Sequence, residues 1–147
     1  MSLTVRQLLN HKTSGVYATR PDASVLEALE LMAREDISSV LVMEGDSLKG
    51  IFTERDYARK VILRGRNSRD TVIRELMTSQ LITMSPEQTI DDCMSIMTEK
   101  HIRHLPVLEG EKVIGLISIG DVVKSIIAGH EETIQQLAGY IAGDLKT

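Results

Sequence analysis

The chain has 147 residues and contains an internal repeat that keeps one register without a gap. Pro21 and Pro86 lie 65 residues apart, and Asp56 and Asp121 have the same separation. That offset also pairs Val25 with Ile90, Met32 with Met97, Ile37 with Ile102, Val42 with Val107, Gly45 with Gly110 and Gly50 with Gly115. Self-similarity at a fixed period indicates repeated structural units. We therefore predict that the chain folds as two copies of one unit.

Each copy is predicted to contain two helices. Ser24 and Thr89 each open a Ser/Thr-x-x-acid pattern of the capping-box type, which marks the start of a helix. The apolar residues that follow recur at intervals of three and four, as in an amphipathic helix. A second helix follows in each copy, from about Glu54 to Leu63 and from about Ile119 to Ile127.

Between these helices, each copy has two apolar runs separated by a turn with glycine, a pattern typical of a β-hairpin. A short apolar segment before the first helix adds a third strand, so each copy is predicted to be β-α-β-β-α. The expected strands are Val16–Ala18, Val40–Met43 and Leu48–Phe52, then Leu81–Thr83, Leu105–Leu108 and Val113–Ile117. One copy is too small to cover both faces of its sheet. We expect an α+β fold in which the two repeats pack sheet to sheet as a pseudo-twofold pair.

Further helices are predicted beside the repeats. Val5–Leu9 is similar to Ile73–Met77, so a short helix precedes each copy, and a last helix covers about Glu131 to Ala142. We expect residues 1–66 to form the first repeat with its N-terminal helix. Residues 67–130 would form the second repeat with an arginine-rich connector, and residues 131–147 a C-terminal helix.

Composition narrows the functional class. The chain is 42% apolar, which excludes disorder, and its single cysteine excludes an internal disulfide. It carries 17 basic and 21 acidic side chains, has no tryptophan and is only 3% aromatic, so we expect no nucleic-acid partner. No apolar run reaches the roughly 20 residues of a membrane helix, and no signal peptide is visible, so we expect a soluble, cytoplasmic protein without membrane attachment. A small anionic ligand remains compatible with this charge.

Two related heptapeptides carry the chemistry, Gly50–Asp56 and Gly115–Asp121. Glycine allows another backbone or a ligand to approach closely. The hydroxyl residue of each, Thr53 or Ser118, is predicted at a helix start, where free N–H groups and the helix dipole favour an anion. The aspartate three residues later can accept two hydrogen bonds from neighbouring hydroxyls, as a ribose 2′,3′-diol offers. Both patterns are equally capping boxes, which is the alternative interpretation.

The whole pattern resembles tandem cystathionine-β-synthase-type (CBS) domains, the Bateman module. Each hairpin ends in the pattern Gly-h-x-[Ser/Thr]-x-x-Asp, where h is an apolar residue, and this pattern is similar to that family's adenosine-nucleotide motif. Two further segments, Val72–Met77 and His101–Val107, are similar to sequences typical of the family. The resemblance covers nearly the whole chain, so we expect no attached catalytic domain. It implies AMP, ADP, ATP or NAD(H) bound in clefts between the two copies, and homodimers that pair through the second helices.

The candidate nucleotide-binding residues are not equivalent in the two copies. At the common offset of 65 residues, Arg103 and His104 correspond to uncharged Ser38 and Ser39. Arg20 and Arg55 correspond to Ser85 and Gly120. We expect Arg103 and His104 to contact phosphate, Arg20 and Arg55 to be secondary contacts, and the site with Ser118 and Asp121 to be the stronger one for AMP. With these, the predicted nucleotide-binding residues are Arg20, Thr53, Arg55, Asp56, Thr83, Ile102, Arg103, His104, Pro106, Ser118 and Asp121.

Other reactive side chains are interpreted as structural. His101 and His104 lie three residues apart, with Cys93 nearby in sequence, but no second spaced pair completes a metal site. Cys93 lies on the apolar face of its predicted helix, which favours a buried thiol over a nucleophile.

These patterns predict a nucleotide-binding regulatory or sensing module, not an enzyme, with no catalytic cofactor. Its expected partners are an adenine nucleotide, a second copy of the chain and an unidentified regulated protein. One alternative is a ligand-free interaction module whose motifs only cap helices. Another is a nucleotide hydrolase, although the sequence provides no catalytic carboxylate pair, metal cluster or activated nucleophile for it.

Overall fold

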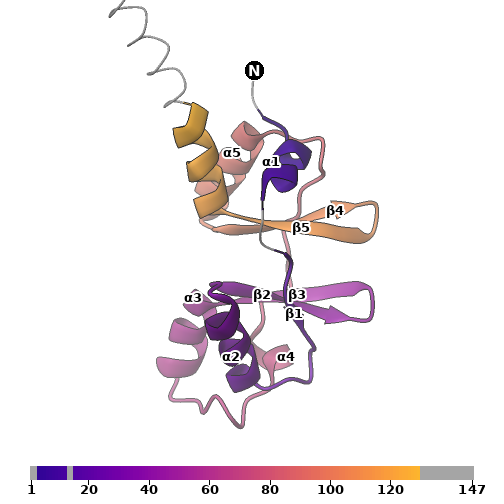
Figure 1. The fold of residues 1–147 in the computed structure, drawn as a ribbon. Coiled ribbons are helices and arrows are strands. Elements are labelled where there is room, and N and C mark those ends of the chain that lie inside the picture. Colours follow the sequence, from indigo (N-terminus) through magenta and orange to yellow (C-terminus); the bar gives the residue numbers. More distant parts are fainter. Residues whose placement is uncertain (1–2, 13–14, 130–147) are drawn as a thin grey trace, which may run out of the picture.

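The computed structural model describes residues 3–12 and 15–129, and its two halves face each other through their sheets (Figure 1). One half contains β1 (Ala18–Thr19), β2 (Ser39–Glu44) and β3 (Ser47–Thr53), with α2 (Val25–Glu35), α3 (Glu54–Asp56), the π-helical η1 (Tyr57–Ile62) and α4 (Ile73–Leu76). The other half contains β4 (His104–Glu109) and β5 (Lys112–Ser118), with α1 (Val5–His11), α5 (Ile90–Lys100) and a helix over residues 119–129. The helices cover the outer faces of the sheets (Figure 1). The predicted α+β fold of two paired repeats is confirmed.

The two hairpins confirm the repeat in detail. β2 pairs with β3 and β4 with β5, both antiparallel, and β1 joins the first sheet parallel to β2. Each ladder shifts register at the same repeat position, after Val42 and after Val107. The turn glycines have φ of 61° at Gly45 and 64° at Gly110, in the left-handed region that glycine adopts without strain. Local sequence was therefore sufficient to predict both hairpins.

The predicted strand Leu81–Thr83 is wrong. The structure has only an isolated parallel bridge between Met84 and Val107 there. In the first copy, the Leu41 amide donates to the Tyr17 carbonyl at 3.0 Å, which brings the edge strand into the sheet. The equivalent residue in β4 is Pro106, which has no N–H to donate. The edge pairing of the second copy is consequently reduced to one residue.

The short helix before each copy packs into the core of the other copy. Val5 and Leu8 of α1 belong to the cluster that contains Leu105 and Ile117, whereas Ile73 of α4 belongs to the cluster of the first copy. The attachments are equivalent: Val5 N donates to Gln88 O at 2.7 Å and Ile73 N to Ala23 O at 2.8 Å. Sequence order and packing therefore differ, because α1 precedes the first copy and completes the second.

The remaining helices were predicted with one local difference. Residues 54–62 are helical as expected, but only the first turn is α-helical and η1 is a π-helix. Residues 119–129 form the expected second helix of the other copy. The helix predicted from Glu131 to Ala142 lies outside the described residues.

The heptapeptide glycines leave room for α1 and α4, which are exchanged in the sense that each packs on the copy that it does not precede. A Cβ on Gly50 would lie 2.7 Å from Met77 Sδ and 2.8 Å from the Thr78 carbonyl oxygen, directly after α4. A Cβ on Gly115 would lie 2.6 Å from Leu9 Cδ2, near the end of α1. The close approach expected at these glycines is therefore made by the segment that ends each exchanged helix.

We predict that Gly50→Ala destabilises the protein more than Gly115→Ala. Overpacking costs about 1–3 kcal/mol, and Gly50→Ala should lie near the upper end because a backbone carbonyl cannot rotate away. Gly115→Ala should lie near the lower end because the Leu9 side chain can change rotamer. Urea unfolding of both variants measures the difference. Equal losses would contradict the assigned contacts.

Candidate functional site

In both heptapeptides, the hydroxyl residue and the aspartate form reciprocal hydrogen bonds at a helix start. Thr53 N donates to Asp56 Oδ2 at 3.0 Å, and Asp56 N donates back to Thr53 Oγ1 at 3.1 Å. Ser118 and Asp121 repeat the arrangement, with 2.9 Å from Ser118 N to Asp121 Oδ2 and 3.1 Å from Asp121 N to Ser118 Oγ. The capping interpretation of these residues is confirmed, and a ribose contact by either carboxylate stays a prediction. Each carboxylate is held in one orientation before any ligand arrives.

A lysine lies against each of these carboxylates. Lys60 Nζ is 3.2 Å from Asp56 Oδ1 and also donates to the Leu76 carbonyl at 3.0 Å. Lys12 Nζ is 2.8 Å from Asp121 Oδ2 and donates to the Leu116 carbonyl at 2.6 Å. All four side chains are at least partly buried, so these ion pairs are screened less than pairs in open solvent.

The pKa of Asp121 reflects this environment. Burial opposes ionisation of the carboxyl group, but hydrogen bonds from Lys12 and from the Ser118 amide outweigh it and lower the pKa of Asp121 below its ordinary value. Asp121 is therefore an ionised acceptor at neutral pH, neutralised by the lysine.

The two lysines come from different parts of the fold. Lys60 lies four residues after Asp56 on the same helical segment. Lys12 follows α1 directly, far from Asp121 in sequence, and reaches it because α1 packs on the second copy. Neither residue was among the sequence-predicted site residues. The four-residue spacing of Asp56 and Lys60 was a usable signal, since such positions are neighbours on a helix. No local pattern pointed to Lys12.

His104 joins the two copies beside this site. Its Nε2 lies 3.2 Å from Ser38 Oγ of the first copy. Burial lowers the pKa of His104 most, and Lys12 and Arg103 lower it further, whereas the carboxylates of Asp121 and Asp56 oppose the shift. The imidazole is consequently neutral at physiological pH. It is a hydrogen-bonding group between the copies rather than a fixed charge.

The structure places the other predicted residues in several environments. Arg20 is exposed and pairs with Asp22, and Arg55, Thr83 and Arg103 are exposed. Ile102 packs against the core of the second copy.

Pro106 is buried between Leu105 and Val107, which belong to that same core. Because successive side chains alternate across a strand, Pro106 faces the first copy. The structure thus brings His104, Ser118 and Asp121 together, whereas Arg20 pairs with Asp22.

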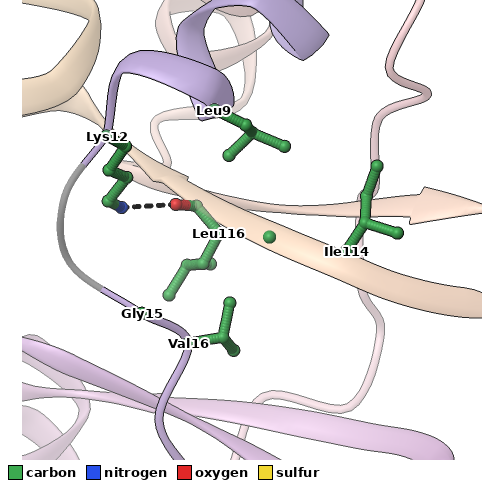
Figure 2. Close-up of a pocket in the computed structure, with 7 residues that line it drawn as sticks. Leu9, Lys12, Gly15, Val16, Ile114 and Leu116 are labelled. Carbon is green, nitrogen blue, oxygen red and sulfur yellow. Dashed lines mark hydrogen bonds between the residues drawn. The ribbon is translucent and has the colours of Figure 1, made fainter.

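A pocket of about 140 Å³ lies next to the second heptapeptide (Figure 2). It is lined by the end of α1, the following segment and β5, with Leu9, Lys12, Gly15, Val16, Ile114, Gly115 and Leu116. Figure 2 shows the Lys12 side chain extended across to the Leu116 carbonyl. Aliphatic side chains share the wall about equally with polar surface, which includes the Lys12 ammonium group and the Leu116 carbonyl. This combination suits a small group that has both apolar and polar atoms.

The described residues contain no cluster of three or more His, Cys, Asp or Glu side chains suited to a metal ion. Cys93 is buried as predicted, and burial raises the pKa of its thiol to about 11. Within residues 3–12 and 15–129, no helix is both long and apolar enough to cross a membrane.

The family is established by comparison with known proteins. The family model of the CBS domain matches residues 5–63 and again residues 73–128. The chain therefore belongs to the CBS-domain family, as a tandem of two such domains. Proteins of this family commonly serve as regulatory or sensing modules.

Relatives and solved structures agree with this assignment. The chain is 40% identical over 127 residues to the mitochondrial CBS domain-containing protein CBSX3 of Arabidopsis thaliana, covering 83% of this chain but only 62% of that relative. It is 48% identical to the structure of a putative signal-transduction protein with CBS domains from Burkholderia ambifaria, with a TM-score of 0.81 over 85% of this chain and 94% of that one. A hexameric CBS-CP12 protein from bloom-forming cyanobacteria is 27% identical, with a TM-score of 0.74 over 84% of this chain and 71% of that one.

We predict that His104 makes stability pH-dependent. Its folded-state pKa lies below the unfolded value of about 6.5, so its contribution is full above that pH and falls as the pH drops towards the folded-state pKa. The free energy of unfolding should therefore decrease between about pH 7.5 and pH 5.5, and decrease less in His104→Gln. Urea unfolding at both pH values measures this. The same decrease in both proteins would contradict the assignment.

Proposed function

We propose that this protein is a regulatory module that binds an adenine nucleotide (AMP, ADP, ATP or NAD(H)) between its two copies and does not catalyse a reaction. The observation that carries the proposal is the arrangement at the two helix starts. At each, a carboxylate is fixed by a backbone amide and paired with a partly buried ammonium group. A ribose diol and a phosphate group need these two functions side by side.

The chemistry of the two ends of a nucleotide supports this assignment. Asp56 and Asp121 are proposed to accept hydrogen bonds from ribose hydroxyls. Thr53 and Ser118 are proposed to contact phosphate at helix starts, where the dipole contributes about 0.3–1 kcal/mol. Tight binding therefore needs additional cations.

The second heptapeptide is proposed to form the stronger site for AMP. Lys12 and Arg103 both lower the pKa of partly buried His104, so two cationic groups accompany the carboxylates of Asp121 and Asp56 there. The pocket beside Leu116 provides apolar surface for a base. At the first heptapeptide, Arg20 is engaged with Asp22, which leaves Arg55 as the other proposed arginine. Pro106 and Thr83 are proposed to line the cleft between copies, with Ile102 behind them.

Calorimetric titration separates this function from its two rivals. Binding of AMP supports the proposal, whereas absence of heat with AMP, ADP, ATP and NADH would leave an interaction module. Product analysis after incubation with ATP tests the hydrolase. The expected result is binding without ADP or AMP formation. A cytoplasmic location stays a prediction that fractionation of cells would test.

We predict a homodimer. Ile62 is 56% exposed on η1, and Val123 and Ile127 are 41% and 48% exposed on the helix over residues 119–129. Exposed apolar side chains on the second helix of each repeat favour burial against another molecule. A second molecule of this protein presents the same surface. Light scattering at micromolar concentration should give twice the 16.3 kDa of one chain. A 16.3 kDa species alone would contradict this prediction.

We predict that each aspartate recognises ribose at its own site. Asp56→Ala and Asp121→Ala should each weaken AMP by about 1.5–3 kcal/mol, as expected for a hydrogen bond to a charged group. The 2′,3′-dideoxy analogue should lose a similar amount with the original protein and little more with the variant. Because both titrations use the same variant, any lost helix cap cancels in the ratio. If variant and original protein discriminate equally against the analogue, the carboxylate is only a cap.

A further inference from the structure

Lys12 donates hydrogen bonds to the acceptor atoms of the second site. Its side chain is 19% exposed and that of Asp121 is 20% exposed, so the pair is largely withdrawn from water. The ammonium group is 2.6 Å from the Leu116 carbonyl oxygen and 2.8 Å from Asp121 Oδ2. Both acceptors border the pocket or the heptapeptide that would receive a ligand. The lysine is therefore bound where ligand hydroxyl groups would bind.

The carboxylate geometry shows why the two cannot bind together. Asp121 Oδ2 accepts hydrogen bonds from both the Ser118 amide and Lys12. A ribose diol that uses both carboxylate oxygens needs acceptor capacity on Oδ2, and each oxygen offers about two lone-pair sites. The amide is fixed by the backbone, whereas the lysine side chain rotates. The diol must consequently displace Lys12.

Displacement has an electrostatic consequence. An ammonium group that leaves a part-buried carboxylate loses its counter-charge, and an unpaired charge in such a place is costly. A phosphate group on the ligand supplies a new partner through charge-assisted hydrogen bonds. A ligand without phosphate supplies none. The displaced lysine therefore favours phosphorylated ligands over neutral ones.

Lys60 does not act in the same way at the first site. It donates to the Leu76 carbonyl and to Thr78 Oγ1 as well as pairing with Asp56 Oδ1. Oδ2 of Asp56 is bonded by Thr53 and not by the lysine. If a ligand draws Asp56 away, Lys60 keeps two acceptors. The selection argued for Lys12 is specific to the second site.

We propose that Lys12 is a built-in occupant of the second site that a ribonucleotide displaces, and that it makes this site select phosphorylated ribonucleosides over unphosphorylated ones. This inference rests on the proposed nucleotide-binding function. It adds to that function a specificity-determining residue that lies outside both heptapeptides.

The test compares adenosine with AMP. Both are titrated calorimetrically into an Asp56→Ala background, which weakens the first site by removing its proposed ribose acceptor, with and without Lys12→Met. Lys12→Met should bind adenosine more tightly and lower the ratio of the adenosine Kd to the AMP Kd by about tenfold or more, as for a charge-assisted hydrogen bond. Lys49→Met is the matched control, because Lys49 is an exposed lysine on β3 and its loss should leave the ratio unchanged.

A second variant, Lys12→Arg, keeps the test informative if Lys12→Met fails to fold. Lys12→Arg keeps the charge and should retain the preference for AMP within about threefold, which is less than one charge-assisted hydrogen bond. Unchanged ratios in Lys12→Met, or equal changes for both ligands, would overturn the inference while AMP binding upholds the function. Weaker AMP with unchanged adenosine would make Lys12 a phosphate contact and overturn its role as occupant. If neither ligand binds any of the proteins, the nucleotide-binding function itself fails.

Discussion

The exchange of the two short helices is the constraint on which the rest of the structure depends. α1 and α4 each precede one copy and complete the core of the other, held by equivalent amide bonds from Val5 and Ile73. The last turn of α1 and the residues directly after α4 then lie against the glycines of the heptapeptides. Neither heptapeptide has its full surroundings within one copy. The pair of repeats is therefore the smallest unit that can form the candidate site.

The sequence was a good guide wherever the interaction is local. The hairpins, the glycine turns and the caps at Ser24 and Thr89 all depend on residues within a few positions of one another. The failure at Leu81–Thr83 is also local in origin, because Pro106 was visible in the sequence and lacks the N–H that Leu41 uses. Treating the copies as equivalent concealed that difference. A repeat predicts shared architecture but not shared hydrogen bonding.

The candidate site was only partly predictable because half of it depends on distant packing. Thr53, Asp56, Ser118 and Asp121 are defined by a short motif, and the structure holds them in matching geometry. Lys12 reaches Asp121 only through the packing of α1 on the second copy, which no spacing in the chain encodes. The arginines at 20 and 55 were favoured for their charge alone, and both are exposed.

The lysines also bear on how an acidic chain could receive the anionic ligand proposed for it. The protein has a formal net charge of −4, yet each heptapeptide carboxylate is already neutralised by an ammonium group. A phosphate approaching either helix start therefore meets a local dipole and a balanced ion pair, not an isolated negative charge. Neutralisation bears on the proposed specificity, because a ligand would exchange partners with the ion pair instead of adding to empty acceptors. The two lysines differ in origin. At the first site the lysine lies on the same helical segment as the aspartate, whereas at the second site it is the C-cap residue of α1, which packs on the second copy. Under the proposed function, ligand exchange at the second site would therefore involve the residue that ends α1.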